Sequence, residues 1–365
     1  MSRVMARARP RLSVGSLPGR AAGAIGAFAR TTSGPVYLVL VVVFFACLLA
    51  VSIDGGVFLS VDNVRDMLIR SVALGIVAAG QTLVILGASL DLSVAYVVSL
   101  ASIIGAETMA DQESRIPLGI LAVLAFGAAV GLVNGLVITK LRVNAFIATL
   151  GVALILRGII ESRYQGPVGG VPDRFEDLGY ESWGPVPISV VLLFAIVGGV
   201  WFLLRYTRFG NRLYAVGGEE QVAKLSGVRT HRVIISAHVL CAMAAAITGL
   251  FLASRLGAGS PLVGTDGGYD LESIAAVVLG GTFLLGGRGG VLGTIAGVFI
   301  LAMLDNTFNQ LEVNAFAKDV ARGTIIIAAV AAYSVRWRRR RRRESVGAGP
   351  GQPAPSGAQA LEAAR

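Results

Sequence analysis

The sequence predicts an all-α protein that crosses a membrane about ten times. Three observations predict this fold class. Hydrophobic residues make up 55% of the chain and charged residues only 15%, and the mean hydropathy of +0.73 is far above that of a soluble domain. Apolar runs long enough to span a bilayer recur along the chain. Arginines gather at both ends, as they do in cytoplasmic segments beside membrane spans.

Ten apolar runs are predicted to be transmembrane helices, with bounds accurate to a few residues. In order, they cover approximately residues 36–53, 68–88, 92–108, 117–138, 145–161, 187–204, 233–253, 271–286, 291–306 and 321–335. Two arginine-rich ends on the same side require an even number of crossings. Eight or twelve crossings are alternatives, because several runs are shorter than the roughly 20 residues that an untilted helix needs.

The charges between the predicted helices differ on the two sides of the membrane. The outer joins are acidic and contain Asp54, Asp62, Asp111, Glu113, Asp173, Glu176, Asp177, Glu181 and Asp266. The inner joins contain Lys140, Arg142, Arg288 and the basic residues around 217–227. This asymmetry supports ten crossings with both termini in the cytoplasm.

Three regions follow from this pattern. Residues 1–35 form a basic cytoplasmic segment, residues 36–335 form the membrane domain, and residues 336–365 form an arginine-rich tail that is expected to be disordered. The first apolar run is expected to be a retained anchor and not a cleaved signal peptide. The terminal arginines favour anionic lipid head groups over nucleic acid as their partners, because the middle of the chain is close to neutral.

Two apolar stretches are predicted to contain interrupted helices. Residues 80–94 hold Asp91 within an almost unbroken apolar run, and residues 280–293 hold seven glycines and one arginine. Interrupted helices at membrane depth occur where they are buried in protein or line a water-filled path. The two stretches fall at comparable points if the chain is divided into two inverted halves of five helices, as in many transporters.

Six polar residues in or near the predicted helices are candidates for the path of a solute. They are Gln81, Asp91, Ser93, Asn134, Asp305 and Asn306. Polar groups at membrane depth are costly unless they are paired or hydrated. An interhelical hydrogen bond is an alternative role for Gln81 and Asn134, and for Asp91 we favour a helix cap over solute contact. Arg157 and Glu161 are spaced to form an ion pair on one helix face.

The sequence has no group of residues typical of an enzyme or a metal site. Its two histidines, His231 and His238, have no carboxylate or cysteine at metal-ligand spacing. There is no GxxxxGK[ST] loop, so the chain itself is not expected to bind ATP in the P-loop manner. Cys47 and Cys241 lie in apolar runs and are expected to pack as small hydrophobic side chains.

A short charged helix is predicted at residues 217–227, between two apolar runs. Glu219 and Glu220 are expected in its first turn, where the helix dipole favours acids. Gly227 is placed to close the helix in a left-handed conformation. Because two turns of helix are marginal in water, we expect a partner to hold it. The flanking arginines place it in the cytoplasm.

Four stretches together resemble the membrane subunit of bacterial ATP-binding-cassette sugar importers, the ribose, xylose and galactose permease group. They are GQTLVILGASLDLSV (80–94), GLVNGLVITKLRVNAFIATLG (131–151), RFGNRLYAVGGEEQVAKLSGV (208–228) and YDLESIAAVVLGGTFLLGGRGGVLGT (269–294). Their order and spacing over residues 36–335 make the resemblance specific.

The resemblance implies a homodimeric permease of the bacterial cytoplasmic membrane that moves a sugar or sugar-like solute by alternating access. Its expected partners are an ATPase subunit, which would bind ATP and Mg²⁺, and an extracytoplasmic solute-binding protein. No cofactor is expected in this chain. The helix at 217–227 matches the coupling helix that docks on the ATPase, through Gly218, Glu219, Glu220, Ala223, Leu225, Ser226 and Gly227. Gly218 stands where the family often has asparagine, and it is expected to start the helix.

The chain departs from the family pattern near the expected path. Ala88, Ser89 and Leu90 precede the DLSV sequence, where glycines and an isoleucine are common, and Asp305–Asn306 replaces a usual pair of asparagines. These departures weaken the expectation of a common pentose or hexose as solute.

Two other classes of protein compete with this interpretation. An ion-coupled secondary transporter would use a buried titratable group such as Asp91 or Glu272, but it gives no reason for the charged helix at 217–227. A membrane enzyme would need a cluster of His, Asp or Glu at one membrane face, which the sequence does not suggest.

Overall fold

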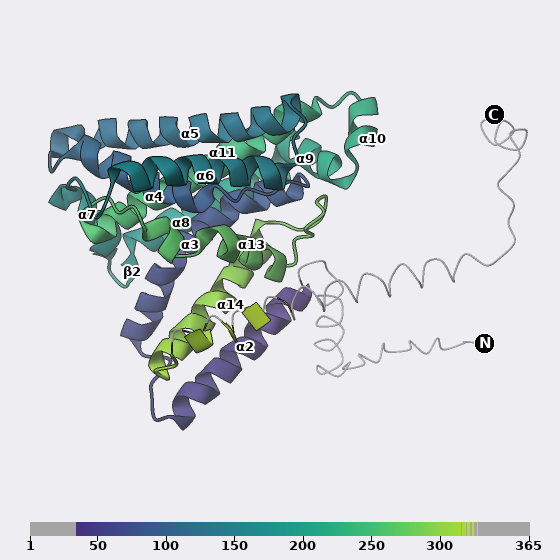
Figure 1. Cartoon of the computed structure of the whole chain (residues 1–365). Helices are drawn as coiled ribbons and strands as arrows, with labels where there is room; N and C mark the ends of the chain where they lie inside the picture. Colours follow the sequence, from purple (N-terminus) through teal and green to yellow (C-terminus); the bar gives the residue numbers. More distant parts are fainter. Residues whose placement is uncertain (1–33, 315, 319, 322, 325–326, 328–365) are drawn as a thin grey trace, which may run out of the picture.

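The computed structural model describes residues 34–314, 316–318, 320–321, 323–324 and 327, and Figure 1 shows their arrangement. Nearly all of the predicted basic segment (1–35), all of the predicted tail (336–365) and most of the tenth predicted helix (321–335) lie outside these residues.

The described part of the chain is almost entirely helical, which confirms the all-α prediction. Its only strands form a two-residue antiparallel pair, β1 (Ser182–Trp183) with β2 (Val186–Pro187). The helices are α2 (Gly34–Ile53), α3 (Val61–Leu86), α4 (Val94–Met109), η1 (Glu113–Arg115), α5 (Ile116–Lys140), α6 (Ala145–Arg163), α7 (Asp173–Tyr180), α8 (Ile188–Tyr206), α9 (Arg208–Gly218), α10 (Glu220–Leu225), α11 (Thr230–Leu256), α12 (Val263–Asp266), α13 (Tyr269–Leu279) and α14 (Val291–Gln310).

Seven of these helices are long and apolar enough to cross a membrane: α2, α3, α5 with η1, α6, α8, α11 and α14. The predicted third helix is α4, which is apolar but has only 16 residues. The predicted count of ten therefore stays a prediction, as does the division into two inverted halves. The chain is a multi-pass membrane protein on either count.

The eighth predicted helix, residues 271–286, is wrong in its second half. Helix α13 ends at Leu279, and residues 280–290 form an irregular segment. Gly281, Gly286, Gly287 and Gly289 all have positive φ in this segment, a conformation that a helix cannot contain. The prediction of an interruption here is thus confirmed. A second interruption, at residues 87–93, separates α3 from α4.

The two ends of the helix bundle differ in charge. Figure 1 shows α9 and α10 at one end of the molecule and α7 and β2 at the other. Basic joins adjoin α10, and the acidic helix α7 lies at the opposite end. The positive-inside rule predicts that the end with α10 faces the cytoplasm, and this orientation stays a prediction.

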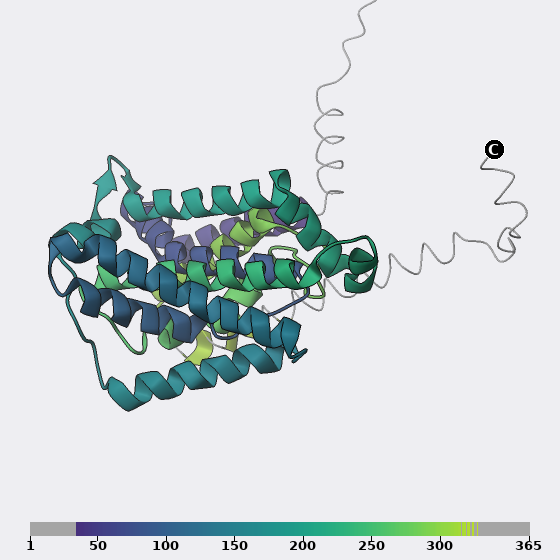
Figure 2. The same ribbon diagram turned by 90° about the horizontal axis from the view of Figure 1, so that it is seen from above.

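Helix α11 lies at the centre and packs against α3, α4 and α5. In Figures 1 and 2, α5 and α6 cover one side of this group, whereas α2 and α14 lie together on the other. Helix α3 is the most buried of the long helices, and it contacts both groups. Large apolar side chains of α2, α5, α6 and α8 point outward, as expected for surfaces that meet lipid or another membrane subunit.

Three glycines allow α5 to pack against the backbone of α11. Gly127, Gly131 and Gly135 recur every four residues along one face of α5, in the small-residue pattern of membrane helix pairs. A Cβ atom on Gly131 would lie 2.5 Å from both the carbonyl oxygen of His238 and the Cα of Val239. Any larger residue at this position would therefore push the two helices apart.

We predict that Gly131→Ala lowers the free energy of unfolding by about 1–3 kcal/mol, because the added methyl group overpacks the interface. Gly151→Ala is the matched control, since a Cβ there meets no atom within 4 Å. The control should be as stable as the wild type or slightly more so. Thermal denaturation in detergent measures both. Equal melting of the two variants would contradict the close packing of α5 on α11.

Candidate functional site

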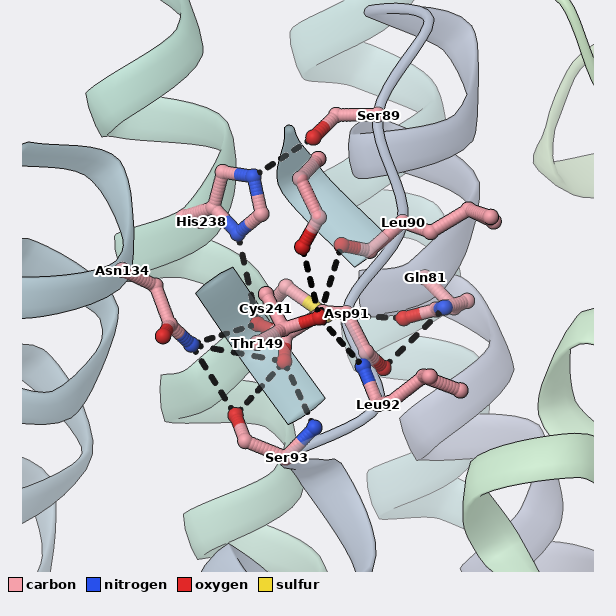
Figure 3. Close-up of polar contacts among 11 residues, drawn as sticks. Gln81, Ser89, Leu90, Asp91, Leu92, Ser93, Asn134, Thr149, His238 and Cys241 are labelled. Atoms are coloured by element: carbon pink, nitrogen blue, oxygen red, sulfur yellow. Dashed lines mark hydrogen bonds and ion pairs between the residues drawn. The ribbon is translucent and has the colours of Figure 1, made fainter. Parts of the chain in front are cut away.

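The interruption between α3 and α4 contains a group of buried polar residues that contact Asp91 (Figure 3). Residues 87–93 are not helical, so several of their backbone groups need partners. Side chains from neighbouring helices supply them. Gln81 Nε2 donates to the carbonyl oxygen of Asp91 at 3.3 Å, and the Leu92 N–H donates to Thr149 Oγ1 at 3.2 Å. Side chains of the protein thus supply partners for part of the backbone of the break.

Asp91 is the centre of this group and is fully buried. Its carboxylate accepts the backbone N–H of Ser93 at 2.9 Å and the Ser93 hydroxyl at 2.6 Å. The N-cap of α4 is Ser93, and no side chain makes a capping bond there, so Asp91 does not cap the helix in the way expected. Its carboxylate instead bonds the backbone two residues ahead, as in an Asx turn. Asn134 Nδ2, from α5, donates to Asp91 Oδ2 at 3.2 Å and to Ser93 Oγ at 2.9 Å. The Asn134 Oδ1 atom is buried without a hydrogen-bond partner.

His238 on α11 joins two points of the interruption. Its Nδ1 lies 3.3 Å from Asp91 Oδ2, and its Nε2 lies 2.9 Å from Ser89 Oγ. The order hydroxyl, imidazole, carboxylate also occurs in serine hydrolases. Here it connects α11 to two nearby residues of one loop (Figure 3), and His238 and Asp91 are both fully buried. The sequence alone did not pair His238 with Asp91.

The six predicted path residues fall into two separate places. Gln81, Asp91, Ser93 and Asn134 form one group, which we call the Asp91 cluster, and all four side chains are fully buried. Gln81 also accepts the thiol of Cys241 at 3.3 Å. Asn306 lies elsewhere, on α14, and exchanges two hydrogen bonds with Asn63 of α3, at 2.7 and 3.2 Å. Asp305 beside it is partly exposed.

Other sequence predictions are also met by direct contacts. Arg157 Nε bonds Glu161 Oε1 at 2.7 Å on an exposed face of α6, which confirms the expected pair. Cys47 and Cys241 are buried free thiols. Within the described residues, no three metal-binding side chains come together.

The short charged helix is present as α10, with narrower bounds than predicted. Gly218 does not begin it, because Gly218 is the last residue of α9 and Glu219 is the N-cap of α10. The extended conformation of Glu219 turns the chain between the two helices, while Glu220 stands in the first turn. Two apolar side chains of α10 are exposed, Val222 to 58% and Leu225 to 89%, whereas Ala223 is buried.

The end of α10 follows the prediction closely. Gly227 has φ of +81°, in the left-handed region. The N–H of Val228 donates to the carbonyl of Ala223, and that of Gly227 to Lys224, both at 3.0 Å. This pair of bonds is a Schellman motif, and it stops the helix after six residues.

Three chain segments meet in direct backbone contact beside α10. The N–H of Gly287, in the irregular segment 280–290, donates to the carbonyl of Leu86 at the end of α3, at 3.0 Å. Gly217, near the end of α9, lies against both of these groups, and a Cβ atom there would collide with the Leu86 oxygen. Tyr214 adds a bond from its hydroxyl to the Gly289 carbonyl, at 2.9 Å. We call this contact the glycine junction. It links α10 to both helix interruptions.

A cavity of about 330 Å³ lies next to the glycine junction. Ser89 of the α3–α4 break lines it, together with Gly217, Glu219, Glu220 and Leu285. Ser89 therefore touches this cavity on one side and His238 on the other.

Comparison with known proteins decides the family. The model of the family described as "Branched-chain amino acid transport system / permease component" matches residues 63–330, which include both interruptions and α10. The chain belongs to this permease family. The permease is a transport subunit and not an enzyme, in agreement with the prediction.

Several characterised permeases are similar to it. The ribose import permease of Escherichia coli K12 is 36% identical over 278 residues, which cover 75% of this permease and 86% of the relative. The L-arabinose transport system permease of the same strain is 37% identical over 292 residues (80% and 88%). The galactose/methyl galactoside import permease of Haemophilus influenzae is 34% identical over 302 residues (77% and 89%). No solved structure gives a significant match.

We predict that Asp91→Ala destabilises the permease by about 3–5 kcal/mol, because it leaves His238, Ser93 and Asn134 buried without their acceptor. Glu161→Ala removes an acid from an exposed pair and should cost about 1 kcal/mol or less. Thermal denaturation in detergent compares the two. A small and equal loss of stability in the two variants would mean that the Asp91 cluster does not stabilise the fold.

We predict that Gly217→Ala abolishes transport or prevents folding, because its methyl group cannot fit beside Leu86 and Gly287. Gly218→Ala is the control one residue away, where a Cβ meets no atom within 4 Å. Uptake by cells that produce each variant measures the effect, and membrane content reports folding. Normal uptake by the Gly217→Ala variant would contradict the glycine junction.

Proposed function

We propose that the chain is the permease subunit of an ATP-binding-cassette importer for a sugar or a sugar-like polar solute, in a bacterial cytoplasmic membrane. The observation that carries this proposal is the similarity to import permeases for ribose, L-arabinose and galactose over three quarters of the chain. The family description names an amino-acid system. We give more weight to the relatives, since each aligns over most of both proteins.

Helix α10 is the proposed docking point for the ATPase subunit. The chain has no P-loop, so ATP and Mg²⁺ would bind to that partner and no cofactor to this chain. An exposed Leu225 beside Val222 offers an apolar anchor in an otherwise polar cytoplasmic surface. Glu219 and Glu220 add negative charge at its start, and Ser226 and Gly227 fix its end. Ala223 packs inward and holds the helix to the bundle.

The glycine junction is the proposed route by which motion of α10 reaches the membrane. Backbone contacts between close-packed segments cannot compress, so a shift of α9 and α10 would displace the ends of α3 and of segment 280–290 together. The end of α3 and segment 280–290 belong to the two helix interruptions. Displacement of the two interruptions would then produce alternating access. We also propose that the permease works as a homodimer.

The Asp91 cluster has a proposed role that differs from direct solute contact. Gln81, Asp91, Ser93 and Asn134 are fully buried within one chain, so a solute would reach them only after helices separate. We propose that they hold the α3–α4 break to α5 and α11 during transport. Asp305 is partly exposed and remains a candidate for weak solute contact, with Asn306 holding α14 to α3.

The outer end is the proposed contact for a solute-binding protein. Helix α7 carries three acids within eight residues, and the β1–β2 turn exposes Trp183. Exposed aromatic side chains are enriched at protein contact surfaces, and the acids of α7 could pair with basic residues of the partner.

An ion-coupled secondary transporter is the competing function. In such a carrier, Asp91 would exchange protons or cations during the cycle. Uptake into proteoliposomes that contain the permease, the ATPase and the binding protein separates the two. Uptake that needs internal ATP and persists with ionophores supports the importer. Uptake that needs no ATP and stops with ionophores overturns it. Ribose, L-arabinose and galactose are the first solutes to try.

We predict that Leu225→Asp weakens binding of the ATPase subunit about 30-fold or more, because it places a charge in the apolar centre of the contact. Glu220→Arg should weaken it as well. Val186→Asp is the control, since Val186 is an exposed residue of β2, which lies at the other end of the molecule (Figure 1). Co-purification of the ATPase with each variant measures binding. Full retention of the ATPase by the Leu225 variant would contradict the proposed coupling role of α10.

A further inference from the structure

The cytoplasmic end has a second cavity that the proposed transport cycle does not use. It is a groove of about 430 Å³ beside the end of α10, lined by Arg212, Arg229, Arg232, Phe209, Val233 and Ser236. The residues come from α9 and from the start of α11. Three arginines thus line one concave site.

These three arginines have no acidic partner among the described residues. Elsewhere in the described chain, Arg70, Arg157 and Arg174 each form an ion pair with a carboxylate, Asp66, Glu161 and Glu113 respectively. No ion pair or side-chain hydrogen bond involves Arg212, Arg229 or Arg232. Three like charges in one groove repel each other, so an arrangement of this kind favours an anionic ligand.

The local fold adds to the positive potential. Arg229 is the N-cap of α11 and Arg232 lies in its first turn, so the groove faces the N-terminal end of a 27-residue helix. The peptide dipoles of a helix favour negative charge at this end. The Schellman turn at Gly227 brings the chain from α10 directly into this position, and Gly227 itself lines the groove.

The position of the groove indicates the source of the anion. It lies where α11, a membrane-spanning helix, begins at the cytoplasmic end. Phe209 and Val233 give it an apolar wall beside the charged groups. A free phosphate ion has no apolar part that could contact such a wall. A phospholipid carries its phosphodiester group next to its acyl chains, which can contact apolar side chains. Guanidinium groups bind phosphate oxygens in pairs, with charge-assisted hydrogen bonds.

We propose that this groove binds the phosphodiester head group of an anionic phospholipid from the inner leaflet. The lipid neutralises the three arginines and fixes α9 against the start of α11. Neutral phospholipids, which carry their own positive charge beside the phosphate, bind less tightly.

Native mass spectrometry of the full-length permease in detergent, with phosphatidylglycerol or phosphatidylcholine added, tests this proposal. We expect phosphatidylglycerol to be retained in preference. The triple variant Arg212→Gln, Arg229→Gln, Arg232→Gln should weaken it by roughly a hundredfold, since each basic residue at an anionic surface contributes about fivefold. Each single substitution should weaken it about fivefold, which keeps the test usable if the triple variant does not fold.

The matched control is the triple variant Arg70→Gln, Arg157→Gln, Arg174→Gln, which loses the same charge from paired arginines. It should retain phosphatidylglycerol within about twofold of the wild type. Equal loss in both triple variants would overturn the proposal, because net charge alone would then explain binding. Tight binding of inorganic phosphate would point to a soluble anion instead. If the groove variant keeps the lipid but loses the ATPase subunit, the arginines meet an acidic protein surface and the proposal is wrong.

Discussion

The constraint on which the rest of this structure depends is the absence of water inside a bilayer. A helix that breaks at membrane depth exposes N–H and C=O groups that only the protein itself can satisfy. In the α3–α4 break, Gln81 of α3 and Thr149 of α6 bond backbone groups, whereas Asn134 of α5 and His238 of α11 bond the carboxylate of Asp91. Those helices must therefore lie very close together. The glycine face of α5 provides that closeness, since Asn134 stands between Gly131 and Gly135 and reaches Asp91 only because α5 touches α11.

The two helix interruptions have different chemistry. The α3–α4 break is rich in side-chain hydrogen bonds around Asp91, whereas the segment after α13 relies on glycines that let backbone meet backbone. Both reach the same place, because Gly287 bonds the last carbonyl of α3 and Gly217 fits against the two. The Asp91 cluster and the glycine junction thus lie near the two ends of one short loop. The hydrogen bonds of the Asp91 cluster resist separation of the segments, and the backbone contacts of the glycine junction resist their compression.

Much of the fold follows from local sequence, and most of what joins its parts does not. Apolar runs give the helices, and Gly227 gives the end of α10, because these signals act within a few residues. Hydropathy failed at residues 280–286, where apolar side chains continue after α13 although the backbone has already left the helix. The start of α10 was misplaced because Gly218, an acceptable cap by residue type, is the last residue of α9, so that Glu219 becomes the N-cap of α10. Only three-dimensional packing pairs His238 with Asp91, 147 residues away. That His238 is one of two histidines, and enters an apolar run, was the available signal.

The separation between Asp91 and its partners also sets an order of events during synthesis. Ser93 leaves the ribosome almost with Asp91, Asn134 follows 43 residues later, and His238 follows 147 residues later. At a translation rate of roughly 5–20 residues per second, the carboxylate waits about 2–9 s for Asn134 and about 7–30 s for His238. A nascent chain therefore carries an incompletely paired acid for many seconds. Until α11 has been synthesised, Ser93 and Asn134 are the residues of this cluster that can already bond the carboxylate.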